Sequence, residues 1–121
     1  MPVEKVSIKE KLDLFTDYWN PRIVGELNGQ FIKLAKLKGE FIWHKHELED
    51  ELFLVISGNL TMELRDKIIL LKEGDFLIVP RGTEHRPVAP EEVQLMLFEP
   101  VGTLNTGNLV NERTKAELER L

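Results

Sequence analysis

The sequence predicts an all-β protein, an antiparallel sandwich or barrel preceded by a short helix, and three observations predict it. From residue 21 onward, short apolar runs alternate with turn-forming Gly, Asn, Asp and Pro residues, which is typical of antiparallel sandwiches and barrels. Helical spacing of apolar residues is confined to residues 1–20. No internal repeat and no linker divides the 121 residues. We therefore expect one compact domain.

The N-terminal segment, residues 1–20, is expected to hold the helix. Ser7 and Glu10 form a capping-box pattern, in which the two side chains satisfy free backbone N–H groups at a helix start. The apolar residues that recur there at helical spacing are Ile8, Leu12, Phe15 and Trp19. Asn20 and Pro21 then end the predicted helix.

Residues 21–100 are expected to form the barrel from short strands. Turn signals such as Asn28-Gly29 separate the apolar runs, and alternation of apolar with polar residues is clearest in residues 60–65. The expected strands are residues 23–24, 31–37, 41–46, 51–56, 60–65, 68–71, 76–79 and 93–98. The tail, residues 101–121, is a Gly/Asn/Thr-rich loop followed by a charged segment that is either a short helix or frayed.

Composition excludes several classes of protein. The net charge of −5 argues against a nucleic-acid or anionic-membrane partner, because both require a basic surface. The chain has no cysteine, so neither a disulfide framework nor a thiolate metal site is possible. The first residues lack an apolar signal segment, and no stretch reaches the length of a membrane span. We expect a cytoplasmic globular protein.

Two of the chain's three histidines stand one residue apart in the segment WHKHELED. Alternate residues of a strand share a face, so His44 and His46 are expected to point the same way. A hairpin turn through residues 47–50 lets Glu51 begin a new strand, and the third histidine, His85, follows the turn PRGTEH. A small barrel could bring these four side chains together.

Three imidazoles and one carboxylate form a ligand set that suits Fe, Mn, Co, Ni or Zn. In a six-coordinate ion this set leaves positions open for water or substrate. The alternative is that these are surface histidines, or core histidines whose hydrogen bonds are satisfied by the protein.

The spacing around the histidines resembles the two motifs of the cupin family of small β-barrels. The positions that match the first motif are Gly39, His44, His46, Glu51 and Gly58. The positions that match the second motif are Gly74, Pro80, Gly82 and His85. Two positions depart from the family pattern. Four residues separate Gly39 from His44 where the family usually has five, and Ala89 stands where the second motif ends in Asn, a position that is not normally a ligand.

The resemblance implies a jelly-roll β-barrel that binds one divalent transition metal ion through His44, His46, Glu51 and His85. Cupins with this ligand set include dioxygenases, sugar isomerases and epimerases, decarboxylases, and proteins that only bind a ligand. We expect a metal-dependent enzyme, and we favour an oxygenase over an isomerase or epimerase. The alternative is a non-catalytic cupin that binds or senses a small ligand, or holds the metal structurally.

The choice between these reactions depends on proton transfer. An isomerase needs a residue that moves a proton, and no histidine remains for that task; Glu47, Glu49 and Asp50 are expected to be solvated in their turn. Arg81 and Arg86 flank the His85 turn and are expected to be surface charges. The residues expected to face inward are apolar: Ile42, Phe53, Met62, Phe76 and Met96. Such a lining favours a small uncharged or aromatic ligand over a phosphorylated one.

Residues 51–56 are apolar on both faces, because Leu52, Leu54 and Ile56 alternate with Phe53 and Val55. A strand with one wet face does not show this pattern. Either another part of the chain or a second subunit covers the outer face, and Trp43 could join the same patch. We expect a homodimer.

Overall fold

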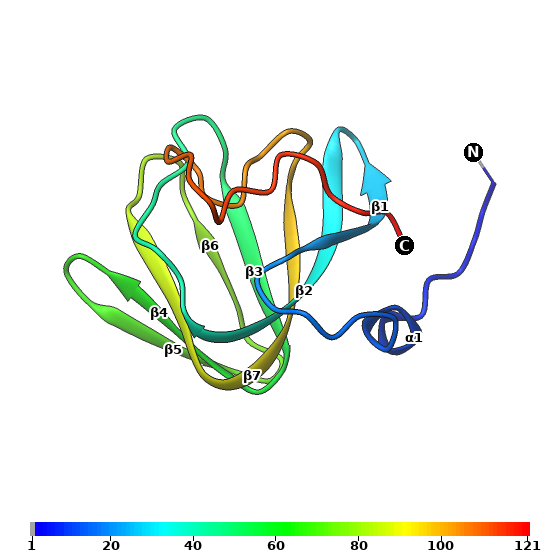
Figure 1. The fold of residues 1–121 in the computed structure, drawn as a ribbon, viewed down its shortest axis with the longest axis horizontal. Coiled ribbons are helices and arrows are strands. Elements are labelled where there is room, and N and C mark those ends of the chain that lie inside the picture. The colour runs from blue at the N-terminus through cyan, green and yellow to red at the C-terminus, as the bar shows by residue number, and fades with distance from the viewer. Residues whose placement is uncertain (1) are drawn as a thin grey trace.

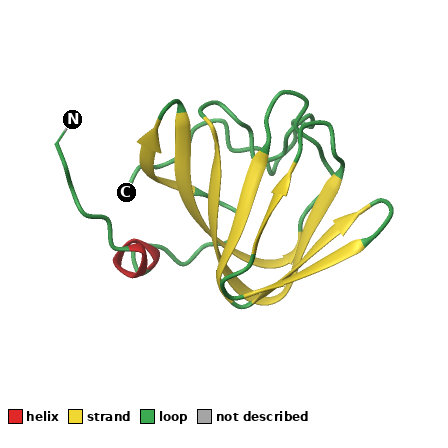
Figure 2. Ribbon diagram, turned by 180° about the vertical axis from the view of Figure 1, so that it is seen from behind, coloured by secondary structure: helices red, strands yellow, loops and turns green. Residues whose placement is uncertain are grey.

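The computed structural model describes residues 2–121. It shows one seven-stranded antiparallel sheet rolled into a jelly-roll barrel, with a short helix outside it (Figures 1 and 2). The strands are β1 (Arg22–Leu27), β2 (Gln30–Glu40), β3 (Glu51–Ser57), β4 (Asn59–Leu64), β5 (Ile68–Lys72), β6 (Phe76–Val79) and β7 (His85–Pro100). The helix is α1 (Ile8–Leu12). The predicted fold class is confirmed.

Strand β7 connects the two halves of the barrel. Its second half pairs with β2 on one side and β3 on the other, and its first half pairs with β4. The sheet order is β1-β2-β7-β3-β6, and β5 is attached through β4. Glu51 at the start of β3 lies opposite Val79 at the end of β6. The short turn after Val79 therefore returns the chain to His85 close to Glu51.

The helix is shorter than predicted. The Ser7 side chain accepts a hydrogen bond from the Glu10 backbone N–H at 3.3 Å, as the capping-box pattern requires. The helix nevertheless ends at Leu12, and both Phe15 and Trp19 lie beyond it. The prediction of one helix continuing to Trp19 is wrong.

Tertiary contacts explain why the helix stops early. Phe15 packs with Leu34 on the outside of the sheet, and its backbone carbonyl accepts a hydrogen bond from the Lys36 ammonium at 2.6 Å. Trp19 instead stacks on Phe41, with ring centroids 4.8 Å apart and planes at 15°. The two aromatic side chains therefore pack against different surfaces, which neighbouring turns of one straight helix would not reach.

Residues 41–46 do not form the predicted strand. Only His44 pairs there, through a single bridge to His85. The register of β2 against β7 shifts between Leu37 and Gly39, and Gly39 has φ +89°. Pairing resumes at Gly39 with Ala89 and ends at Glu40 with Val88, so the regular ladder stops before the histidines. The other expected strands lie within observed strands, or extend one by a single residue.

Apolar side chains pack on both faces of the sheet. Inside the barrel, the main cluster of buried residues comprises Ala35, Leu37, Phe53, Val55, Leu60, Met62, Leu71, Val79, Ala89, Val93, Leu95 and Leu97. A smaller cluster joins the helix to the sheet and comprises Leu12, Phe15 and Leu34, with Val24, Ile56, Met96 and Leu121 packed against it. The barrel interior alone therefore does not account for all the buried apolar surface.

The set of residues predicted to face inward is partly wrong. Phe53 and Met62 belong to the inner cluster, whereas Phe76 is 60% exposed and Met96 packs against the smaller cluster. Leu54 pairs with both Phe76 and Met96, and it follows the inward-facing Phe53. Since neighbouring residues of a strand alternate between faces, these three residues share the outer face.

The C-terminal tail forms turns and folds back over one end of the barrel (Figure 1, orange to red). The Leu121 N–H donates a hydrogen bond to the Ile23 carbonyl at 3.0 Å. Lys45 and Asn108 exchange two hydrogen bonds, from Lys45 N to Asn108 Oδ1 at 2.9 Å and from Asn108 N to Lys45 O at 2.8 Å. In residues 2–121, no helix combines the length and the apolar character needed to cross a bilayer. The cytoplasmic location stays a prediction.

Candidate metal centre

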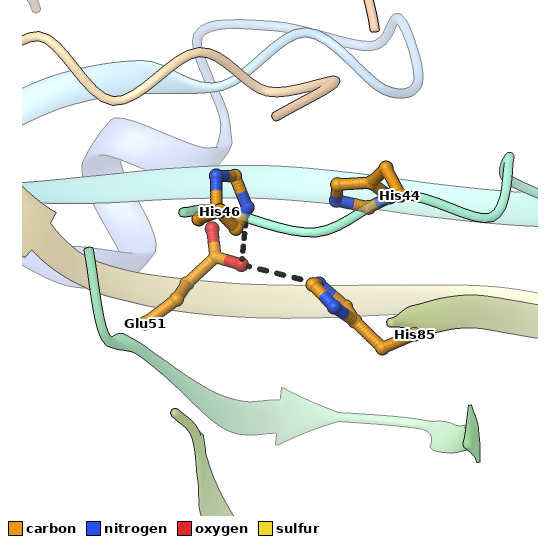
Figure 3. Close-up of side chains that lie close together, drawn as sticks. All are labelled: His44, His46, Glu51 and His85. Carbon is orange, nitrogen blue, oxygen red and sulfur yellow. Dashed lines mark ion pairs between the residues drawn. The ribbon is translucent and has the colours of Figure 1, made fainter. Parts of the chain in front are cut away.

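The structure brings the four predicted side chains, His44, His46, Glu51 and His85, into one group (Figure 3). Each of them offers a ligand atom, and these atoms all lie within 4.8 Å of one another. His85 is fully buried and the other three are at most 4% exposed. Two of the residues come from the connection between β2 and β3, and the other two open β3 and β7. This group could hold a metal ion.

Backbone carbonyls orient two of the imidazoles. The Nδ1 of His44 lies 2.9 Å from the Ile42 carbonyl, and the Nδ1 of His85 lies 2.9 Å from the Thr83 carbonyl. Because a carbonyl only accepts hydrogen bonds, each Nδ1 carries the proton. Each Nε2 is then free for a metal, as is common where a histidine binds one.

The centre of the group contains buried polar atoms that lack hydrogen-bond partners. They are both ring nitrogens of His46, Nε2 of His85 and Oε1 of Glu51. The Glu51 oxygen lies 3.2 Å from Nε2 of His46 and 3.5 Å from Nε2 of His85 (Figure 3). Leaving such atoms buried and unpaired is costly. A cation among them would satisfy Oε1 of Glu51, Nε2 of His85 and one ring nitrogen of His46 together, so the residues present fit a bound metal ion.

The protein environment keeps the ligands in the forms that bind metals. Burial, followed by the neighbouring His85, lowers the pKa of His44 from 6.5 to about 4. Burial alone would raise the pKa of Glu51, but interactions with Glu99, His46 and His85 outweigh it and hold this pKa well below its ordinary value. At neutral pH, His44 is therefore an uncharged imidazole and Glu51 is a carboxylate.

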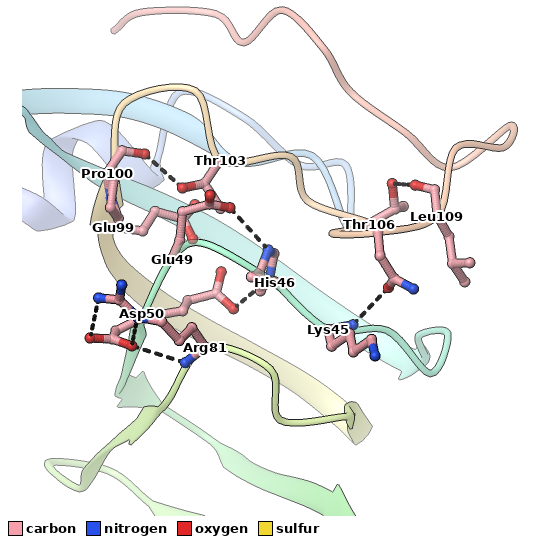
Figure 4. A network of polar contacts seen from close by, with 12 residues as sticks. Lys45, His46, Glu49, Asp50, Arg81, Glu99, Pro100, Thr103, Thr106 and Leu109 are labelled. Atoms are coloured by element: carbon pink, nitrogen blue, oxygen red, sulfur yellow. Dashed lines mark hydrogen bonds and ion pairs between the residues drawn. The ribbon is translucent and has the colours of Figure 1, made fainter.

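The acidic turn between His46 and Glu51 is only partly solvated. The Asp50 carboxylate accepts hydrogen bonds from the backbone N–H of Arg81 at 2.9 Å and from its guanidinium at 3.3 Å (Figure 4). Glu49 lies 3.9 Å from Nδ1 of His46, with a side chain only 25% exposed. Asp50 and Glu47 are solvated as expected, with side chains 52% and 58% exposed, whereas Glu49 is more buried than expected. The contact of Asp50 with Arg81 connects the turn that follows His46 to the turn that precedes His85.

Comparison with known proteins decides the family. The family model described as "Cupin domain" matches residues 31–100. The chain belongs to the cupin family. This cupin is 41% identical to a cupin-2 domain containing protein from Shewanella frigidimarina, and the crystal structure of that protein superposes with a TM-score of 0.78. The match covers 78% of this chain and 93% of that chain.

Two further relatives are similar to this cupin. A crystallised protein from Neisseria meningitidis is 28% identical, with a TM-score of 0.74 and coverage of 80% of this chain and 99% of that chain. The uncharacterized protein YdbB of Bacillus subtilis is 42% identical over 64 residues, which cover 52% of this chain and 57% of the relative. The match therefore spans little more than half the length of that curated relative.

A cavity adjoins the candidate metal centre of this cupin. Its volume is about 40 Å³, enough for more than one water molecule. Three of its lining residues are ionisable: His44, Glu51 and Glu99. The other lining residues are Trp19, Pro21, Ala35, Leu37, Phe41, Phe53, Pro87, Leu95, Leu97 and Asn105. The cavity is thus largely apolar, with its ionisable groups at and beside the metal centre.

Sequence reasoning missed Glu99 and its partner Lys33. The Lys33 ammonium lies 2.6 Å from Oε1 of Glu99, and each side chain is 2% exposed. Burial and the charge of Glu51 raise the pKa of Glu99 well above its ordinary value, and Lys33 opposes this. The alternation Val93, Leu95, Leu97 was the available signal, because it places residue 99 on the same face.

The remaining charged and aromatic candidates lie outside the centre. Arg86 forms an ion pair with Glu63 at 2.7 Å. Trp43 lies against the guanidinium of Arg65, 3.9 Å from its ring centroid, and Arg86 lies 5.7 Å from the same ring. Trp43 therefore packs against these arginines, not beside Leu54 as an outer patch would require.

Proposed function

We propose that this cupin is a metal-dependent enzyme that acts on a small organic molecule. One divalent transition metal ion would be held by His44, His46, Glu51 and His85. The observation that carries the proposal is the convergence of four buried ligand atoms beside a largely apolar cavity. Fe, Mn, Co, Ni and Zn all suit this ligand set. When bound, such an ion supplies Lewis-acid or redox chemistry.

An oxygenase is the reaction class that we favour. Within residues 2–121, the side chains lining the cavity include neither Lys nor Arg, although recognition of a phosphate group normally uses them. Apolar walls made by Phe41, Phe53 and Leu97 favour an uncharged or aromatic substrate and keep water away from it. His44 and Glu51 line the cavity, so a molecule held there lies against the metal centre.

Glu99 supports an isomerase or epimerase as the second candidate. These reactions move a proton at carbon and need a group that accepts and returns it. The Glu99 carboxyl lines the same cavity as Glu51, so a residue of the required type is present.

Metal loading followed by two assays tests these proposals. Purified protein would be loaded with Fe(II), Mn(II) or Zn(II), and its metal content measured by elemental analysis. Oxygen uptake with phenols, diketones and hydroxyketones would be followed with an electrode, and deuterium exchange at carbon by NMR. Metal-dependent oxygen uptake that is lost in His44→Ala and kept in Glu47→Gln supports the oxygenase. Glu47 is a suitable control because it lies in the adjoining turn, with a side chain 58% exposed.

The other outcomes of these assays are equally informative. Deuterium exchange without oxygen uptake supports the isomerase. Tightly bound zinc with neither activity favours the non-catalytic alternative, in which the ion is structural or the cupin only binds a ligand.

We also propose that two copies of this cupin pair through the outer face of β3 and β6. The smaller cluster, which joins the helix to the sheet, covers Ile56. Phe76 and Ile78 of β6, however, are 60% and 56% exposed. They lie beside Leu54 and Leu52, respectively, in the sheet. Contiguous exposed apolar residues are typical of protein interaction sites, and a second copy would cover them by self-complementary packing.

A further inference from the structure

The chain after β7 crosses one end of the barrel as a strap, residues 101–118 (Figure 1). The structure describes all of the strap, which contains turns and neither a helix nor a strand. At one end the strap continues β7 from Pro100. At the other end, the Ile23 N–H of β1 donates to the Glu119 carbonyl at 2.9 Å, and the Leu121 N–H donates to the Ile23 carbonyl at 3.0 Å. The strap is therefore fixed to the sheet at both ends.

Between these ends, the strap contacts the segment that carries two of the ligands. Lys45 stands between His44 and His46. Its backbone N–H donates to Oδ1 of Asn108 at 2.9 Å, and its carbonyl accepts from the Asn108 N–H at 2.8 Å. A Cβ added to Gly107 would lie 3.1 Å from Cδ2 of His44, the ring carbon bonded to Nε2. The strap therefore passes beside the nitrogen that is free for a metal.

The ligand side chains have almost no contact with solvent. None of the four is more than 4% exposed, and the adjoining cavity has room for only a few water molecules. Asn105 of the strap lines this cavity together with His44 and Glu51. A metal ion or an organic substrate therefore reaches the ligands only if part of the protein moves.

Polar contacts, and not apolar packing, hold the strap in place. Across residues 101–118, all of which the structure describes, no apolar side chain is buried. The buried Thr106 donates from Oγ1 to the Leu109 carbonyl within the strap, at 2.6 Å (Figure 4). Arg113 adds a bond to the barrel, from Nη1 to the Glu40 carbonyl at 3.0 Å. A segment with few buried apolar contacts opens at a lower free energy than the core, so the strap is the part that can move while the barrel stays folded.

We propose that the strap is a lid, which opens to admit the metal ion and the substrate and closes to keep water from the metal centre. Loops that cover a site commonly control entry and release in this way. The two bonds between Asn108 and Lys45 hold the strap closed over His44. This inference rests on the proposed function, because the entry that the strap controls is entry to the metal centre.

The rates of metal exchange test the inference. Uptake of Co(II) by the metal-free protein, and release of Co(II) to EDTA, would be followed by stopped-flow absorption. Asn108→Ala removes one of the two bonds to Lys45, so we expect uptake and release both to become about fivefold faster. The dissociation constant should change little, because the two rates change together. A variant that only disturbed the ligands would instead release the ion faster without taking it up faster.

A disulfide supplies the opposite change. The chain has no cysteine of its own, and the backbone hydrogen bond between residues 45 and 108 keeps their Cα atoms within the separation that a disulfide spans. Oxidised Lys45→Cys/Asn108→Cys should exchange Co(II) at least about tenfold more slowly in both directions, and reduction should restore both rates. Asn59→Ala is the control for Asn108→Ala, because Asn59 is also exposed but begins β4.

The outcomes separate the two proposals. Faster uptake and release in Asn108→Ala, with Asn59→Ala unchanged, support the inference, as does slowing by the disulfide that reduction reverses. Unchanged rates in Asn108→Ala, or faster release without faster uptake, overturn it. Oxidised protein that exchanges Co(II) as fast as reduced protein also overturns it; the proposed metal-dependent function stands in each case. Protein that takes up no metal overturns both proposals.

Discussion

His44 and His85 are joined by two backbone hydrogen bonds, from His44 N to His85 O at 3.1 Å and from His85 N to His44 O at 2.9 Å. Their ring centroids consequently lie 4.3 Å apart. Because the main chain sets this distance, two of the four candidate ligands are in place before an ion binds. Such preorganisation lowers the conformational-entropy cost of binding the ion.

Replacing His44 by Ala should abolish most metal binding and leave the barrel folded. The variant removes one ligand nitrogen, whereas the backbone bonds to His85 do not depend on the side chain. We expect the metal affinity to fall by more than about 100-fold, the upper end of the loss caused by removing a supporting residue. Chelator competition measures the affinity, and circular dichroism checks the fold. An affinity unchanged from wild type would show that His44 is not a ligand.

The metal-free protein should lose stability in acid because of His44. Its pKa is lowered from 6.5 to about 4 by burial and by His85, so the unfolded chain takes up this proton first as the pH falls. The effect is absent above about pH 6.5, grows as the pH falls toward 4, and reaches about 3 kcal/mol. Urea unfolding of wild type and His44→Gln at pH 7 and pH 4.5 measures it. The wild type should lose more stability than the variant; equal losses would contradict the prediction.

Substitution of Gly107 should loosen the tail over the metal centre. An added Cβ at this position would overlap the Lys45 carbonyl and approach Cδ2 of His44 to 3.1 Å. Gly107→Ala should therefore lower both the thermal stability and the metal affinity. Gly102→Ala is the matched control, because Gly102 also has positive φ but its Cβ would meet nothing within 4 Å. That control should cost only the backbone strain, about 1 kcal/mol. Equal effects of the two variants would exclude steric contact as the cause.

Lys33→Met alone should destabilise the protein far more than the double variant with Glu99→Leu. The single change leaves Glu99 buried without its counter-ion, at a cost of about 3–5 kcal/mol, whereas apolar replacement of both partners is often nearly neutral. Chemical denaturation of the two variants and wild type measures the difference. If the two variants were equally unstable, packing of the Lys33 stem and not charge would be responsible.

Leu54→Glu should convert the proposed dimer to a monomer. Leu54 lies between Phe76 and Met96 on the outer face of the sheet, so a carboxylate there would be buried in the interface without a partner. Light scattering after size exclusion reports the mass. Leu27→Glu is the control, since Leu27 is 45% exposed on β1, which lies at the opposite end of the sheet order from β6. A Leu54→Glu protein that remained dimeric at low concentration would place the interface elsewhere.

Local patterns account for the parts of the fold that could be predicted. Alternation of apolar with polar residues at positions 60–65 and turn signals such as Ser57-Gly58-Asn59 act over a few residues, and the observed strand boundaries follow them closely. The motif spacing likewise identified His44, His46, Glu51 and His85, which the structure brings together. Their binding of a metal is the part that stays a proposal.

Contacts between distant residues account for the errors. Phe15 and Trp19 have the spacing of a helix, but packing on Leu34 and stacking on Phe41 separate them. Phe76 was expected to face inward, which is wrong. In a short run made only of apolar residues, the sequence does not show which residues face the barrel interior. The pairing of Phe76 with Leu54 decides its face.

By itself, the sequence determined that this chain forms a β-barrel with one helix before it, and that four side chains of metal-binding type occur at cupin spacing. These properties depend on residue order over short distances, where alternation and turn formation act. Only the tertiary structure decided that Glu99, paired with Lys33, lies beside Glu51, and that the cavity opens on this group. These two residues come from β2 and β7, so pairing of strands distant in the chain, and the burial that follows, places them there.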